Sequence, residues 1–102
     1  MLTHIVMWKF LDEADGHTKR ENMAIVRQKL EDLRPQVPQI LHMELHEDIG
    51  ADRNPFDMVL ITRFDDAQSL QAYQTHPAHK AVSAFVSTVR SDRAVVDYIT
   101  EG

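Results

Sequence analysis

A tyrosine and two histidines lie within seven residues of one another, at Tyr73, His76 and His79. Histidine is the side chain whose ordinary pKa lies near neutral pH, so it accepts or donates a proton under physiological conditions. A tyrosine hydroxyl beside such a base can donate a hydrogen bond to a developing oxyanion. The combination predicts proton transfer on a carbonyl compound, with His79 as the base for an acidic α-proton and Tyr73 as its partner.

A structural role is the alternative for the same three side chains. The rings of Tyr73 and His79 could instead tie their segment to the rest of the fold through buried hydrogen bonds. His76 directly precedes Pro77, so it is a candidate for capping or packing at a helix break as well as for substrate binding.

Further candidates lie in the first ten residues. His4, Val6, Trp8 and Phe10 occupy alternate positions, so in a strand all four point to one face. His4 is either a core histidine with satisfied hydrogen bonds or a polar group in the wall of a cavity. We take His4, Val6 and Trp8 as candidate substrate-binding residues, although Trp8 and Phe10 suit a hydrophobic core better than a ligand-stacking role.

The alternating run His42, Glu44 and His46 contains side chains that bind metals. Same-face positions on a strand lie about 7 Å apart, which is awkward for closing three ligands around one ion. A solvated strand face or a polar seam in a dimer is the better interpretation, and we expect no metal. The sequence contains no Gly-rich phosphate loop and no serine or cysteine nucleophile motif, so we expect no cofactor either.

Composition limits the class of protein. The 102 residues, 43% apolar and 26% charged, suit a single globular domain over 1–102. A formal charge of −5 argues against nucleic acid or an anionic membrane as the main partner. The absence of cysteine is compatible with a reducing compartment, and the apolar opening run is too short to cross a bilayer and lacks the features of a secretory signal. We therefore expect a cytoplasmic protein.

Periodicity predicts the elements that must position these side chains. Apolar or alternating runs predict strands over about 2–10, 41–46, 57–64 and 93–99, separated by loops that include 12–16 and 47–56. Helical spacing predicts one helix over about 18–34, capped by Thr18, and a second that starts at Asp65 or Asp66 and is broken at Pro77. The resulting β-α-β-β-α-β order is that of a ferredoxin-like α+β fold with a four-stranded antiparallel sheet.

The first and third predicted strands are apolar on both faces. Ile5 and Met7 point away from the side that holds His4, and Val59 and Ile61 do the same in the third strand. Helices cover only one face of such a sheet, and large exposed apolar patches are unusual on monomers. We therefore expect a homodimer in which two sheets pack face to face and bury about 1,600 Å² or more. The alternative is a twisted sheet covered by its own loops.

Several segments, in this order, resemble the stress-responsive A/B barrel (Dabb) family. They are His4-Ile5-Val6-Met7-Trp8-Lys9-Phe10 at the start, Pro38-Gln39-Ile40, the strand leading to Phe64, Tyr73-Gln74-Thr75-His76-Pro77-Ala78-His79, and Val95-Val96-Asp97-Tyr98 at the end. The resemblance implies a ferredoxin-like subunit that dimerises into an α+β barrel. It implies less about activity, because most members have no assigned reaction.

One plant member that this chain resembles more distantly, olivetolic acid cyclase, closes a ring by aldol chemistry without metal or cofactor. The resemblance implies that Tyr73 and His79 correspond to its catalytic pair and His4 to a pocket histidine. The chain departs from the cyclase in having no tyrosine on the first helix and in having Met58 near the position of a third-strand histidine.

Three hypotheses for function follow. The first is a homodimer that binds a small apolar or carbonyl-containing molecule between sheet and helices. The second is a cofactor-independent enzyme, either a cyclase-like aldol catalyst or a related monooxygenase. The third is a structural or regulatory dimer without a functional pocket.

Overall fold

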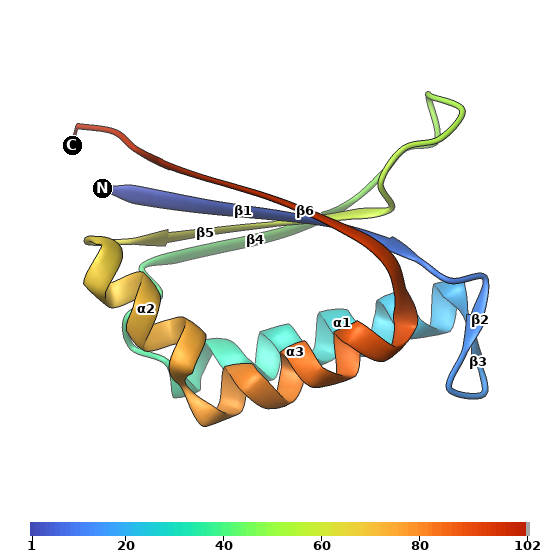
Figure 1. The fold of residues 1–102 in the computed structure, drawn as a ribbon, viewed down its shortest axis with the longest axis horizontal. Coiled ribbons are helices and arrows are strands. Elements are labelled where there is room, and N and C mark those ends of the chain that lie inside the picture. The colour runs from blue at the N-terminus through green and yellow to red at the C-terminus, as the bar shows by residue number, and fades with distance from the viewer. Residues whose placement is uncertain (102) are drawn as a thin grey trace.

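The computed structural model describes residues 1–101 and places all the main helices on one face of a four-stranded sheet (Figure 1). The elements are β1 (Leu2–Phe10), β2 (Glu13–Ala14), β3 (His17–Thr18), α1 (Lys19–Leu33), the 3₁₀ turn η1 (Arg34–Gln36), β4 (His42–Glu47), β5 (Met58–Phe64), α2 (Ala67–Thr75), α3 (Pro77–Val89) and β6 (Arg90–Ile99). The strand order in the sheet is β4-β5-β1-β6, and all neighbouring strands are antiparallel. The predicted ferredoxin-like α+β fold is confirmed.

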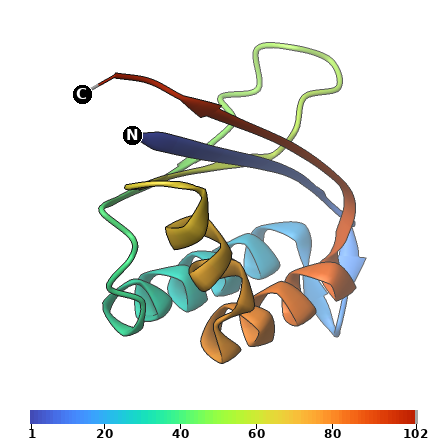
Figure 2. The same cartoon turned by 60° about the vertical axis from the view of Figure 1, so that its left-hand side comes forward.

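The core lies between the sheet and the helices, which Figure 2 shows packed together beneath the strands. Alternate residues of β1 and β5 face this layer and are buried, as the period of a strand requires. The helices contribute their own apolar stripes to the same core. The buried helix residues include Val26, Leu30, Leu33, Leu70, Tyr73, Val86 and Val89.

Side chains at the helix starts explain where α1 and α2 begin. The Thr18 hydroxyl accepts a hydrogen bond from the Glu21 N–H, and the Glu21 carboxylate accepts one from the Thr18 N–H at 2.8 Å. This reciprocal capping box satisfies two amide groups that have no partner within the helix. Asp66 caps α2 by accepting a hydrogen bond from the Ser69 N–H at 2.8 Å. Both caps were predicted from the sequence.

The break between α2 and α3 lies at His76, as predicted. Its backbone is extended, with φ −63° and ψ 132°, and Pro77 occupies the first turn of α3, where the missing proline N–H removes no helical hydrogen bond. The Nδ1 atom of His76 accepts a hydrogen bond from the Ala78 N–H at 3.0 Å. The imidazole therefore caps α3.

Two boundaries differ from the sequence prediction. Residues 12–16 were expected as a loop, but β2 and β3 form a short hairpin there. Its turn is Asp15-Gly16, with φ values of 52° and 78°, the left-handed backbone typical of a tight two-residue hairpin turn. The last strand was expected from 93, whereas β6 begins at Arg90, directly after α3 and without an intervening loop.

The early start of β6 creates a β-bulge. Trp8 pairs with Arg93 and Phe10 pairs with Arg90, so β6 has one more residue than β1 between these pairs. Regular alternation would place Arg90 and Arg93 on opposite faces, because they are three positions apart. The extra residue returns both arginines to the side of Trp8 and Phe10, which face the helices.

Within residues 1–101, no helix covers the other face of the sheet (Figures 1 and 2). Its centre is apolar and only partly covered, and it is formed by Ile5, Met7, Val59, Ile61, Val96 and Tyr98, which we call the outer face. Val96 is 54% exposed and Tyr98 is 43% exposed. None of the helices within residues 1–101 has the length and apolar character needed to cross a membrane.

Candidate functional site

A cavity of about 240 Å³ lies between the sheet and the helices. Its apolar walls come from β1, β5, α1 and α3, through Val6, Trp8, Leu30, Leu60, Val82 and Val86. Its polar lining includes His4, Tyr73 and His79. The structure thus brings together five of the six site residues expected from the sequence, whereas His76 lies outside the lining and caps α3.

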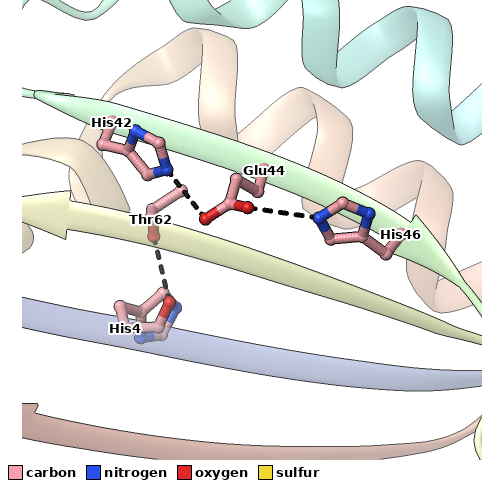
Figure 3. Close-up of polar contacts among 5 residues, drawn as sticks. All are labelled: His4, His42, Glu44, His46 and Thr62. Carbon is pink, nitrogen blue, oxygen red and sulfur yellow. Dashed lines mark hydrogen bonds and ion pairs between the residues drawn. The ribbon is translucent and has the colours of Figure 1, made fainter.

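His4 is held by a carboxylate from the neighbouring strand. The residue is 4% exposed, and the register of β1 and β6 places it directly opposite Asp97. The Nδ1 atom of His4 contacts Oδ1 of Asp97. The Thr62 hydroxyl donates to the His4 carbonyl at 3.3 Å (Figure 3). A carboxylate bound at Nδ1 fixes the orientation of the ring. Nε2 makes no hydrogen bond within residues 1–101, which leaves it available to a molecule in the cavity.

Tyr73 joins the two histidines. The centroid of its ring lies 4.3 Å from that of His79 and 6.4 Å from that of His4. Burial raises the pKa of Tyr73 to about 12, against an opposing effect of the Arg93 charge. The hydroxyl therefore stays protonated near neutral pH and acts as a hydrogen-bond donor. The contact with His79 is between rings, with no hydrogen bond between the two side chains in the described part of the chain.

His79 is half-buried at the side of the cavity. Its Nδ1 lies 3.2 Å from the carbonyl oxygen of Gln74. With the proton on Nδ1, the ring donates to this carbonyl and leaves the Nε2 lone pair free. Burial lowers the pKa of His79 below its ordinary value of 6.5, and the hydrogen bond to Gln74 opposes this shift. The nearby charges of His4 and Arg93 lower it further. His79 is therefore a neutral imidazole near neutral pH, as general-base chemistry requires.

The lowered pKa of His79 predicts an acid-sensitive fold. Below about pH 6.5 the unfolded chain binds a proton at His79 that the folded chain does not, so the free energy of unfolding falls as the pH drops towards the folded-state pKa. Urea unfolding at pH 7.5 and 5.5, at one fixed protein concentration, should show a smaller pH-dependent loss for His79→Gln than for the wild type. A pKa of 6.5 or above for His79 in an NMR titration of the folded protein would contradict this.

Sequence reasoning missed Arg90 and Arg93 as cavity residues and Asp97 as the partner of His4. Arg90 and Arg93 line the cavity, and Asp97 holds His4. In a strand, Asp97 and Val95 point to the same face because they are two positions apart. This alternation is a weak indication that Asp97 faces the core. That His4 is the partner of Asp97 follows only from the pairing of β6 with β1. Arg90 was missed because the predicted strand began at 93.

The side chains of His42, Glu44 and His46 lie on the outer face of β4, away from the helices. Figure 3 shows the Glu44 carboxylate between the two imidazoles. Nε2 of His42 is 2.8 Å from one Glu44 oxygen, and Nε2 of His46 is 3.2 Å from the other. The hydrogen bond with His42 is the main reason why the pKa of Glu44 is lowered, and the hydrogen bond with His46 lowers it further. No group of three or more acidic or histidine side chains within residues 1–101 is arranged to hold a metal ion.

Comparison with known proteins gives the same architecture. The stress-response A/B barrel domain-containing protein DABB1 of Arabidopsis thaliana is 29% identical over 104 residues, covering 99% of this chain and 48% of that protein. The chain therefore spans about half the length of that relative.

Solved structures share the fold. A dimeric ferredoxin-like protein of unknown function from Thermobifida fusca has a TM-score of 0.84 and 23% identity, over 97% of this chain and 90% of that one. A hydroxynitrile lyase from Passiflora edulis has a TM-score of 0.80 and 14% identity, over 98% of this chain and 93% of that one. The model of the Stress responsive A/B Barrel Domain matches residues 2–100. This chain therefore belongs to the stress-responsive A/B barrel domain family.

Proposed function

We propose that this protein is a homodimer that binds a small, partly apolar, carbonyl-containing molecule in the cavity between its sheet and its helices. The observation that carries the proposal is the cavity itself, in which apolar walls surround a few converging polar groups, the usual composition of a small-molecule site. Its volume of about 240 Å³ lies below the range of about 300–1,000 Å³ typical of ligand pockets, which favours a compact ligand.

The polar groups of the cavity suit a carbonyl oxygen. Tyr73 is a permanent donor near neutral pH because burial keeps its hydroxyl protonated. His4 presents Nε2 from a ring that Asp97 holds in place. A carbonyl oxygen in the cavity would therefore meet the Tyr73 hydroxyl donor from α2, while the remainder of the molecule contacts valine, leucine and tryptophan side chains.

The outer face supports the homodimer. It leaves a continuous apolar strip of strand residues uncovered, and surfaces of that kind are usually covered by a partner. A second copy of the sheet is the partner that fits, because the related Thermobifida fusca structure is described as dimeric. The His42–Glu44–His46 row lies at the β4 edge of this face, where polar groups suit the rim of an interface.

The chain provides its own reporter for a binding test. Trp8 is the only tryptophan and lies in the cavity wall, so its fluorescence should respond to a bound molecule. We expect saturable changes with at least one of acetophenone, phenylacetamide and phenylacetate. Val82→Phe, which fills the cavity, should abolish them, and Ala81→Phe on the exposed side of α3 should not. No saturable response of the wild type to any of the three at millimolar concentration would overturn the proposal.

Proton-transfer catalysis is the second candidate, favoured by the neutral His79 beside the His4–Asp97 pair. In this function His79 would remove an α-proton and Tyr73 would donate to the enolate oxygen, which suits a cyclase-like aldol reaction or the related monooxygenase chemistry. The fold neighbour from Passiflora edulis is a hydroxynitrile lyase, so this architecture supports catalysis in another chain. Equal turnover of a poly-β-keto thioester by the wild type and by folded His79→Ala would remove this candidate.

A further inference from the structure

Two arginines lie at the cavity in a chain that is acidic overall. The formal charge of the protein is −5, yet among residues 1–101 the cavity lining contains Arg90 and Arg93 and no carboxylate. Arg90 is half-buried and Arg93 is exposed, which fits side chains that reach from the β6 edge of the sheet to the cavity opening. The cavity therefore combines apolar walls with a positively charged side.

The guanidinium groups of Arg90 and Arg93 have no partner among residues 1–101. Within residues 1–101, neither arginine side chain forms an ion pair or a hydrogen bond. Asp97 lies opposite His4 in the register of β6 and β1, and its carboxylate is already bound to His4. The two arginine side chains are thus available to an anion in the cavity.

The β-bulge is what places both charges there. Without the extra residue between the Trp8–Arg93 and Phe10–Arg90 pairs, Arg90 would lie on the outer face. Bulges commonly re-aim side chains next to functional sites. A guanidinium group matches the geometry of a carboxylate, which accepts paired N–H donors, and two such groups belong to the lining of this cavity.

We propose that the ligand is the anion of a small apolar carboxylic acid, with its carboxylate bound by Arg90 and Arg93 and its apolar body against the cavity walls. This rests on the proposed function, of which it specifies the ligand class. Trp8 pairs directly with Arg93, so a ring or short chain attached to the carboxylate would lie over the indole and extend toward Val6 and Leu60. Burial of that apolar body supplies affinity, and the arginines select the charge.

The test compares phenylacetate with phenylacetamide, which match in shape and differ in charge. At 150 mM salt we expect Trp8 fluorescence to report at least about tenfold tighter binding of phenylacetate, the size of effect that charge-assisted hydrogen bonds produce. Arg93→Gln, and separately Arg90→Gln, should remove most of this preference, because each weakens the binding of phenylacetate more than that of phenylacetamide. Arg20→Gln removes the same charge from the exposed surface of α1 and should behave as the wild type.

Each outcome is decisive for the ligand class. Loss of the phenylacetate preference in Arg93→Gln, with native circular dichroism and phenylacetamide binding still saturable, supports the proposed ligand class. Phenylacetamide binding as tightly as phenylacetate to the wild type overturns it but leaves the small-molecule function intact. An undiminished preference in both arginine variants also overturns it. If neither compound, nor acetophenone, binds the wild type, both the ligand class and the proposed function fail.

Discussion

Val96→Asp should convert the proposed homodimer into monomers. Val96 pairs with Ile5 at the centre of the outer face and is 54% exposed in the single subunit, so the aspartate is hydrated there and costs the isolated fold little. In a face-to-face sheet dimer the same carboxylate would be buried without a partner, which costs several kcal/mol. We expect the dissociation constant of the dimer to rise at least about 100-fold, which corresponds to about 2.7 kcal/mol.

Sedimentation equilibrium at micromolar concentration measures this change. Ala81→Asp is the matched control, because it adds one negative charge at an exposed position of α3, on the opposite side of the molecule from the outer face. The control should remain dimeric. A Val96→Asp protein that dimerises as tightly as the wild type would show that the outer face is not the interface, and a monomeric wild type would refute the homodimer altogether.

Phe64→Ala should cost about 3–5 kcal/mol of unfolding free energy. Phe64 is fully buried at the end of β5, and its ring lies 5.1 Å from that of Tyr73. Removing it deletes a large apolar side chain and leaves a void that the surrounding core fills only in part. Because Tyr73 loses one of the rings that position it, ligand binding should weaken as well. Urea unfolding at a fixed protein concentration measures the stability loss, and Trp8 fluorescence titration measures the binding.

Phe56→Ala is the control for the loss of unfolding free energy expected in Phe64→Ala. Phe56 is half-buried in the loop between β4 and β5, where its ring accepts the Lys9 ammonium at 5.5 Å from the centroid. Its truncation should cost about 1 kcal/mol or less, since it removes one partly exposed cation–π contact. Equal losses from the two variants would mean that Phe64 does not anchor the core.

Local signals explain why most of the fold could be predicted. The capping box of Thr18 and Glu21 and the proline after His76 act through neighbouring residues, so their effect is visible in a short window of sequence. The alternation of β1 likewise placed His4, Val6 and Trp8 on one face before any partner strand was known. These are the residues of the expected site that line the cavity together with Tyr73 and His79.

The parts of the site that could not be predicted depend on pairing between segments that are distant in the sequence. Asp97 becomes part of the site only because β6 lies beside β1 in a register that opposes it to His4, 93 residues away in the chain. Arg90 requires in addition the bulge, which no periodic pattern reveals. The β2–β3 hairpin had a local signal, the Asp15-Gly16 turn, but its two-residue strands are too short to show alternation.

Because of the bulge in β6, the number of residues between Arg90 and Arg93 decides which charged side chains line the cavity. Removal of one residue between Arg90 and Arg93 would turn Arg90 through half a rotation of the strand, out of the cavity and into the proposed subunit contact. A relative shortened by a single codon at this point could thus keep both arginines and still present a less cationic pocket. To find which relatives share this binding property, one would count the residues between the positions that pair with Trp8 and Phe10. A comparison of residue types alone would miss the difference.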